Sequence, residues 1–135
     1  MFSMFVGGGM GLYVDNHLRQ SWTVDGGTYI HGLNNTMRLA IEPNGNTRIY
    51  DHDGNTRLSL DADGSFSLCD ETGRGVIQRW SDGVVVIYDN NGSPRLSIST
   101  DNWSPAELMS SDGTHKIGVD DYGPFYVKDD VLFRL

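Results

Sequence analysis

Apolar residues recur at every second position in short runs along the chain, with polar residues between many of them. Leu58 and Leu60 flank Ser59, and Leu96 and Ile98 flank Ser97. A period of two is typical of β-strands with one apolar and one polar face. The pattern therefore predicts short strands whose apolar stripe is only two residues wide. The stripe comprises the pairs Leu39/Ile41, Leu58/Leu60, Phe66/Leu68, Val85/Ile87, Leu96/Ile98, Ile117/Val119 and Phe125/Val127.

Turn residues separate these runs at a regular spacing. Two interleaved series, each with a period of 19 residues, bring a turn residue every 9 or 10 positions. Glycine adopts positive φ without steric cost, which favours it in hairpin turns. Connections this short join antiparallel strands, because parallel strands need crossovers of about a dozen residues. We therefore predict an all-β antiparallel meander with a 19-residue repeat. The series are Gly26, Gly45, Gly64 and Gly83, and Asn16, Asn35, Gly54, Gly73 and Gly92.

Composition agrees with this prediction and narrows the function classes. The 15 Asp and 17 Gly suit turns, whereas only 3 Glu, 3 Ala and 2 Lys are present to favour helices. This excludes a helical bundle and a doubly wound α/β enzyme. The net charge of −8 argues against a nucleic-acid groove or an anionic membrane surface as partner. Because Cys69 is the one cysteine, an intramolecular disulfide and a cysteine-based zinc site are excluded.

The sequence divides into three segments. Residues 1–11 combine an apolar stretch with a run of glycines, and we expect them to form an N-terminal anchor and a flexible joint. Residues 12–129 carry the repeat and form a β-shaft, and residues 130–135 form a C-terminal strand or tip. The apolar stretch Met1–Val6 is too short to span a bilayer and lacks the features of a signal peptide.

A sheet with an apolar stripe on one face needs a partner surface, because burial of that stripe is its main source of stability. A stripe two residues wide suits a narrow core on a symmetry axis. We expect three copies with their stripes turned inward to form a triangular prism, in which cyclic closure covers the apolar face of every chain.

Two segments of the repeat, residues 48–60 (RIYDHDGNTRLSL) and 87–98 (IYDNNGSPRLSI), resemble the shafts of bacteriophage tail fibres and tail-tip proteins. The likeness extends over residues 12–129. It implies a homotrimeric β-prism or β-helical stalk, and a structural virion protein that acts as a fibre, spike or tail-tip subunit in host attachment. Such a protein is made in the host cytoplasm and resides in the extracellular particle. The implied partners are other copies of the chain, tail or neck proteins bound through the N-terminus, and a host-surface glycan or receptor.

The same tyrosine-aspartate segments also resemble the repeats of Rhs-type toxin shells. Those shells are very long chains that enclose a cargo, so we expect the fibre resemblance to be the better guide for 135 residues. Two further functions stay open at this point: a carbohydrate- or receptor-binding module, and a capsid decoration protein.

Patterns for catalysis and metal binding are weak. The aspartates at 51–53, 61–63 and 120–121 lack the spacing of a calcium loop, and we expect them to cap turns. The histidines His17, His31, His52 and His115 show no metal-binding spacing, although three copies of one histidine on an axis would offer ligands. Nucleotide-binding and hydrolase motifs are missing from the sequence. We therefore predict a non-enzymatic protein without cofactor or metal.

The candidate ligand-binding residues are Asn102 and Trp103, where the repeat slips by two residues. A tryptophan in a loop is a natural platform for a sugar ring or a partner protein, and the alternative is that Trp103 folds back onto the sheet. We expect the arginines that recur with the 19-residue period to pair with aspartates on the polar face. Arg79 stands where the repeat has an aliphatic residue, and we expect it to pair with a nearby carboxylate.

Overall fold

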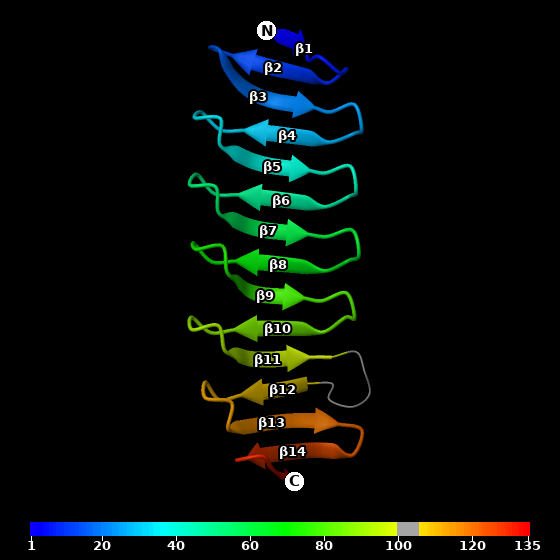
Figure 1. Ribbon diagram of the computed structural model, residues 1–135. Helices are drawn as coiled ribbons and strands as arrows, with labels where there is room; N and C mark the ends of the chain where they lie inside the picture. Colours follow the sequence, from blue (N-terminus) through cyan, green and yellow to red (C-terminus); the bar gives the residue numbers. More distant parts are fainter. Residues whose placement is uncertain (100–105) are drawn as a thin grey trace. The chain divides into compact units, whose positions relative to one another are not determined.

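The computed structural model describes residues 1–99 and 106–135, and this part of the chain is all-β and antiparallel (Figure 1). Fifteen described strands lie in one sheet in the order of the sequence, each beside its neighbours in the chain. This confirms the predicted all-β antiparallel meander. A search of the described residues for helices long and apolar enough to cross a membrane found none.

The strands are three to six residues long, as short as the alternation of apolar and polar residues predicts. They are β1 (Phe2–Met4), β2 (Met10–Val14), β3 (His17–Trp22), β4 (Thr28–His31), β5 (Met37–Ile41), β6 (Thr47–Tyr50), β7 (Thr56–Leu60), β8 (Phe66–Cys69), β9 (Gly75–Arg79), β10 (Val85–Tyr88), β11 (Pro94–Ile98), β12 (Ala106–Met109), β13 (His115–Asp120), β14 (Gly123–Lys128) and β15 (Val131–Arg134).

Tight turns close the hairpins at the positions that the sequence predicts. In the β5–β6 turn, the Gly45 N–H donates to the Glu42 carbonyl at 2.9 Å, and the Glu42 N–H donates to the Asn46 carbonyl at 2.8 Å. In the next turn, the Asp51 carboxylate accepts a hydrogen bond from the Asn55 N–H at 2.9 Å. Aspartate is abundant because its short side chain reaches the N–H groups of its own turn. Positive φ occurs at Asn16, Gly26, Asn35, Gly45, Gly54, Gly64, Gly73, Gly83 and Gly92, among others.

The strands group into two compact units. The first unit comprises Met1–Asp63 and Cys69–Gly73, and the second comprises Gly64–Leu68 and Arg74–Leu135. In the first unit, β1 pairs with the start of β2, so the segment expected to be an anchor contains a strand of the sheet. In the second unit, β15 pairs with β14.

Hydrogen bonds also link successive turns on the same side of the sheet. In the first unit, the Ala62 N–H donates to Asn46 Oδ1 at 2.9 Å, and Asn55 Nδ2 donates to the Glu71 carbonyl at 3.0 Å. In the second unit, Arg74 donates to the carbonyl of Asn90 in the same way. These bonds join residues 16 positions apart, and they restrain each turn against the next one.

Strand β14 departs from the predicted stripe. Gly118 lies opposite Phe125, which places Phe125 and Val127 on the face away from Ile117. The prediction that this pair continues the stripe is therefore wrong. Four residues separate Val119 from its partner on β14, whereas five separate the corresponding partners in the β5–β6 hairpin. One residue fewer reverses the face, because side chains alternate with a period of two.

Candidate functional site

Each unit has one sheet face on which mostly apolar side chains lie in two adjacent rows, and we call it the apolar face. Residues directly opposite one another in antiparallel strands share a face, so the strand register defines the rows. In the first unit the rows are Met4, Met10, Trp22, Thr28, Ile41, Thr47, Leu60 and Phe2, Leu12, Gln20, Ile30, Leu39, Ile49, Leu58. In the second unit they are Arg79, Val85, Ile98, Ala106, Val119, Pro124 and Ile77, Ile87, Leu96, Leu108, Ile117, Tyr126, Phe133.

The apolar face is uncovered in both units. Ile49 is 42% exposed in the first unit, and Leu108 and Ile117 are 58% and 56% exposed in the second. The described strands form one sheet, so no second layer of described residues packs on these side chains. Contiguous exposed apolar surface of this kind marks an interaction site in a soluble protein.

On the opposite face of each unit, the small residues are buried by side chains of the same sheet. Its small and apolar residues are among the most buried in the structure: Ala40 is 3% exposed, Val86 5% and Phe125 4%. The Phe125 ring lies over Gly118, where an added Cβ would meet the ring and would lie 2.7 Å from a backbone oxygen. The Arg134 guanidinium lies 5.7 Å from the centre of the same ring. Large side chains therefore shield their smaller neighbours on this face, and they do not do so on the apolar face.

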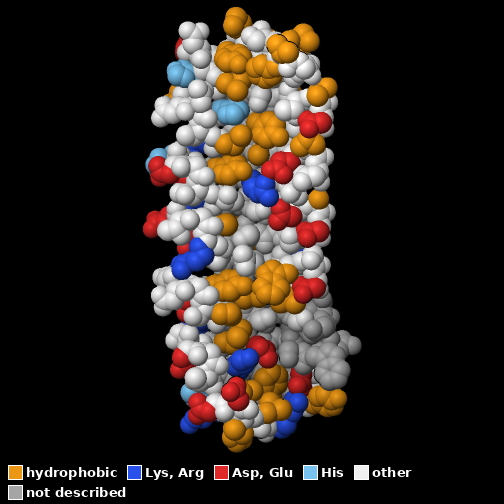
Figure 2. Space-filling view, viewed as in Figure 1, with side chains coloured by type: hydrophobic (Ala, Val, Ile, Leu, Met, Phe, Trp, Pro, Cys, Tyr) orange, Lys and Arg blue, Asp and Glu red, His pale blue; other side chains and the backbone are white. Residues whose placement is uncertain are grey.

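Ion pairs also lie on the opposite face. Arg48 lies 2.6 Å from Glu42 and 3.6 Å from Asp61 in the first unit, and Lys116 lies 4.0 Å from Glu107 in the second. Basic and acidic side chains lie among hydrophobic ones on the face drawn in Figure 2. Exposed pairs of this type contribute only about 0–1 kcal/mol each, but they keep a surface hydrated.

The predicted arginine–aspartate pairs form at two repeats. Arg57 lies 4.0 Å from Asp51, and Arg95 lies 3.7 Å from Asp89. Hydrogen bonds from the Ser93 and Asn91 N–H groups, together with Arg95, hold the pKa of Asp89 below its ordinary value despite some desolvation. The turn aspartates thus act as anionic caps for backbone donors.

Arg79 has a different partner from the one expected. Its guanidinium donates a hydrogen bond of 2.6 Å to the Gly64 carbonyl, at a neighbouring turn of the second unit. The acceptor is therefore a backbone oxygen and not the carboxylate that the sequence led us to expect. A charged side chain is tolerated in a row of the apolar face because its charged end reaches the turn.

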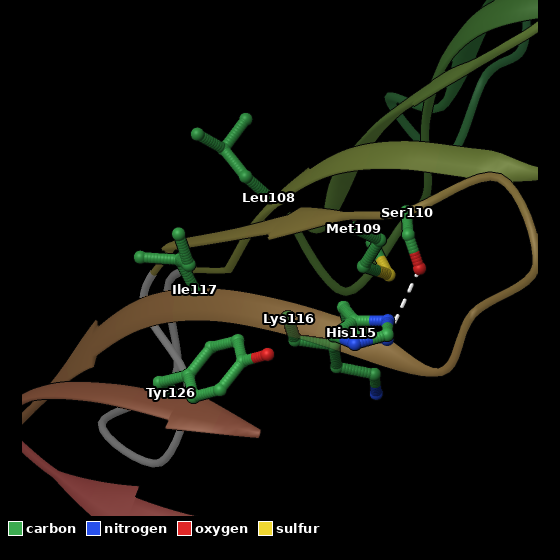
Figure 3. Close-up of a pocket in the computed structure, with 7 residues that line it drawn as sticks. All are labelled: Leu108, Met109, Ser110, His115, Lys116, Ile117 and Tyr126. Carbon is green, nitrogen blue, oxygen red and sulfur yellow. Dashed lines mark hydrogen bonds between the residues drawn. The ribbon is translucent and has the colours of Figure 1, made fainter. Parts of the chain in front are cut away.

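The apolar face of the second unit is hollowed between β12, β13 and β14 (Figure 3). One open hollow of about 190 Å³ is lined by Leu108, Ile117, His115 and Tyr126, among others. The His115 and Tyr126 ring centres lie 6.1 Å apart, and Tyr126 stacks on Phe133 at 6.1 Å. The dashed line in Figure 3 is the bond from the His115 N–H to a serine hydroxyl.

A second hollow of about 320 Å³ lies on the same face and is lined chiefly by apolar residues, including Leu96, Leu108, Val119 and Pro124. Sequence reasoning missed this aromatic and apolar surface near the C-terminus, because it assigned the wrong residues of β14 to the stripe. The short turn before Gly123 is the signal that identifies the correct ones.

Both predicted binding residues, Asn102 and Trp103, lie outside the described residues. Among the described residues, no three His, Cys, Asp or Glu side chains form a group that could hold a metal ion. His52 is highly exposed beside Asp53, with 3.2 Å between Nε2 and the carboxylate, and the His31 ring lies 3.5 Å from the Ser21 hydroxyl. The apolar face is therefore the candidate functional site in the described part of the chain.

A scan against protein-family models and a search of the curated proteins both gave no match to this chain.

Proposed function

We propose that this chain is a structural subunit that associates with copies of itself through the apolar face, forming a homotrimeric β-prism shaft. The observation that carries the proposal is the contrast between the two faces of one sheet. In each unit one face buries its small residues, whereas the apolar face leaves Ile49 in the first unit, and Leu108 and Ile117 in the second, about half exposed. A single layer with one uncovered apolar face lacks a core until another surface covers it.

The exposed area is sufficient for a stable interface. About a dozen large apolar side chains on the two rows are 38–77% exposed, from Ile30 (38%) to Met4 (77%), whereas others such as Leu39 are less exposed. At roughly 200 Å² for a full side chain, about a dozen of them offer on the order of 1,000 Å² per chain, and a typical partner in a specific complex buries about 800 Å². At ~25 cal/mol per Å² this corresponds to ~25 kcal/mol per chain before the cost of association.

Copies of the same chain suit this surface better than a charged partner does. The two rows, as defined by the described register, contain no carboxylate and one basic residue, Arg79, whose charge is bound to the Gly64 carbonyl. Such a face has little charge to match against another protein, but it matches itself because each repeat presents apolar residues at the same spacing. Cyclic symmetry then covers the face of every copy.

A width of two residues favours three copies over a broad two-sheet sandwich, because three narrow stripes meet in one thin core. The turn-to-turn hydrogen bonds support the rigidity that a shaft needs, as between Asn46 and Ala62. The resemblance of residues 48–60 and 87–98 to phage tail-fibre shafts supports a place in the tail of a virion, with host attachment as the task.

Mass measurement in solution tests the assembly. We expect about 45 kDa, three times the chain mass of 15.0 kDa, by light scattering or native mass spectrometry. A dimer would retain the role of the apolar face but overturn the prism, and a stable 15.0 kDa monomer would overturn self-association itself. Gold-labelled antibodies against the chain test the location: label on the tails of phage particles supports the proposal, and label on the capsid overturns it in favour of a decoration protein.

A further inference from the structure

Gln20 is a polar residue within a row of the apolar face of the first unit. It lies on β3 with Leu12 opposite it on β2 and Ile30 opposite it on β4. Trp22, two residues further along β3, is on the same face. Within residues 1–99 and 106–135 the structure shows no hydrogen bond to the Gln20 side chain. The amide therefore has unused donors and acceptors, and Gln20 lies on the face that self-association would cover.

Because the apolar residues repeat regularly, a residue that interrupts the repeat is needed to define the axial register of associated copies. Positions 39 and 58, which lie 19 and 38 residues after Gln20 in the same row, are both leucine. Two copies displaced by one repeat, which is two strands or ~9.6 Å, would still place apolar residues against apolar residues at most positions. A repeated apolar stripe therefore specifies its axial register weakly. Gln20 is the point where a displaced copy would set an amide against leucine.

We propose that Gln20 fixes the axial register of the assembled copies by forming amide-to-amide hydrogen bonds across the symmetry axis. An amide suits this role because it both donates and accepts, so identical side chains satisfy one another. Aligned copies bring their amides together, and displaced copies bury each amide unpaired among apolar side chains, which is costly. A single buried amide sets the register of helical coiled coils on the same principle.

The other polar positions of the two rows are less suited. Arg79 has only donors, three copies of it would repel, and its guanidinium already donates to the Gly64 carbonyl. Thr28 and Thr47 carry short hydroxyls, which reach less far from the sheet than the amide of a glutamine. The inference rests on the proposed self-association through the apolar face, and the experiment below separates the two.

Register is measured with full-length chains in a Cys69→Ser background, each carrying one further cysteine. Leu39→Cys and Leu58→Cys chains, one of them labelled with ¹⁵N, are unfolded, mixed in equal amounts, refolded and oxidised. Mass spectrometry then counts the disulfides. Aligned copies give 39–39 and 58–58 bonds, whereas copies displaced by one repeat give 39–58 bonds. We expect 39–58 bonds to be rare with Gln20 present and to rise on the order of tenfold with Gln20→Leu.

Two further chains serve as controls. Gln78→Leu makes the same chemical change on the opposite face, where Gln78 donates to the Ser67 hydroxyl, and we expect it to leave the register unchanged. Gln20→Asn keeps an amide and should keep 39–58 bonds rare. We expect the thermal midpoint of Gln20→Leu to equal or exceed that of the parent, because the substitution replaces each amide and its partners together and leaves no polar group unpaired. A purely structural role for Gln20 predicts a lower midpoint with an unchanged register.

A second measurement does not depend on disulfide geometry. Nitroxide labels at Asp53→Cys, in a highly exposed turn, report the distance between copies by pulsed electron paramagnetic resonance. We expect one distance with Gln20, and additional longer distances with Gln20→Leu. A trimer whose 39–58 bonds and label distances do not respond to Gln20→Leu overturns the role of Gln20 alone. A parent chain that is monomeric overturns the proposed function, and with it this inference.

Discussion

Replacing Ile49 by aspartate is the most direct test of the apolar face. Ile49 lies in its row in the first unit between Leu39 and Leu58, which are opposite it on the neighbouring strands, and is 42% exposed. Burying an isoleucine completely stabilises by about 1.5–3 kcal/mol, so the exposed part contributes ~1 kcal/mol per chain and ~3 kcal/mol per trimer. Three aspartates in the same narrow core add a desolvation cost of several kcal/mol per ion.

A combined loss of at least ~6 kcal/mol per trimer raises the half-assembly concentration about 100-fold, because that concentration varies as the square root of the trimer dissociation constant. The assay is sedimentation equilibrium over a dilution series, with circular dichroism to check the strands. Ser59→Asp adds the same charge on the opposite face, one residue from Leu58, and should leave assembly nearly unchanged. Ile49→Val should weaken it only slightly. If Ile49→Asp and Ser59→Asp dissociate at the same concentration, the apolar face is not the interface.

Three further predictions concern the second unit. Gly118→Ala should displace the Phe125 ring and lower stability by about 1–3 kcal/mol in thermal unfolding, and an unchanged midpoint would contradict the packing described for this pair. A hydrogen bond from a serine hydroxyl, with others from a threonine, lowers the pKa of Asp112 to about 2 from its ordinary 3.8. Because the pKa of Asp112 is lower in the folded chain, the ionised carboxylate stabilises the turn above pH 3.8, and this stabilisation is lost as the pH falls from about 3.8 to 2. The amides of the turn should therefore exchange faster as the pH falls through that range. An NMR titration midpoint near 3.8 for Asp112 would refute this. Arg134→Gln should raise the lowered pKa of Asp120 toward its ordinary value and speed amide exchange in β15, because a 2.6 Å hydrogen bond joins the two side chains. If neither NMR measurement changes, the pair does not hold the strand.

The sequence predicts most of the fold because its two local signals agree. Glycine and asparagine permit positive φ at the turns, and the alternation of residues such as Leu58, Ser59 and Leu60 sets the faces of the strands between them. The prediction fails at Phe125, where a turn one residue shorter reverses the face. Alternation alone does not show this, because it carries no information on how many residues the chain spends in a turn.

The candidate site was predictable only in outline. A stripe two residues wide follows from the sequence, but the contrast in burial between the two faces does not. Ala40, for example, is buried between the larger cross-strand residues Tyr29 and Arg48, and that burial depends on the strand register as well as on the alternation of residues. The acceptor for Arg79 is likewise a backbone carbonyl 15 residues away, which no pattern of side-chain charges identifies.

The distribution of charge favours the proposed association through one face over aggregation through both. The carboxylates that give the net charge of −8 lie mainly in turns, as at Asp51 and Asp112, or on the opposite face, as at Glu42. The two rows of the apolar face contain none. Copies can therefore approach through the apolar face without bringing carboxylates together there, whereas approach through the opposite face brings like charges together and desolvates ion pairs. The abundance of aspartate, which turn geometry requires, would thereby also direct the proposed association to a single face.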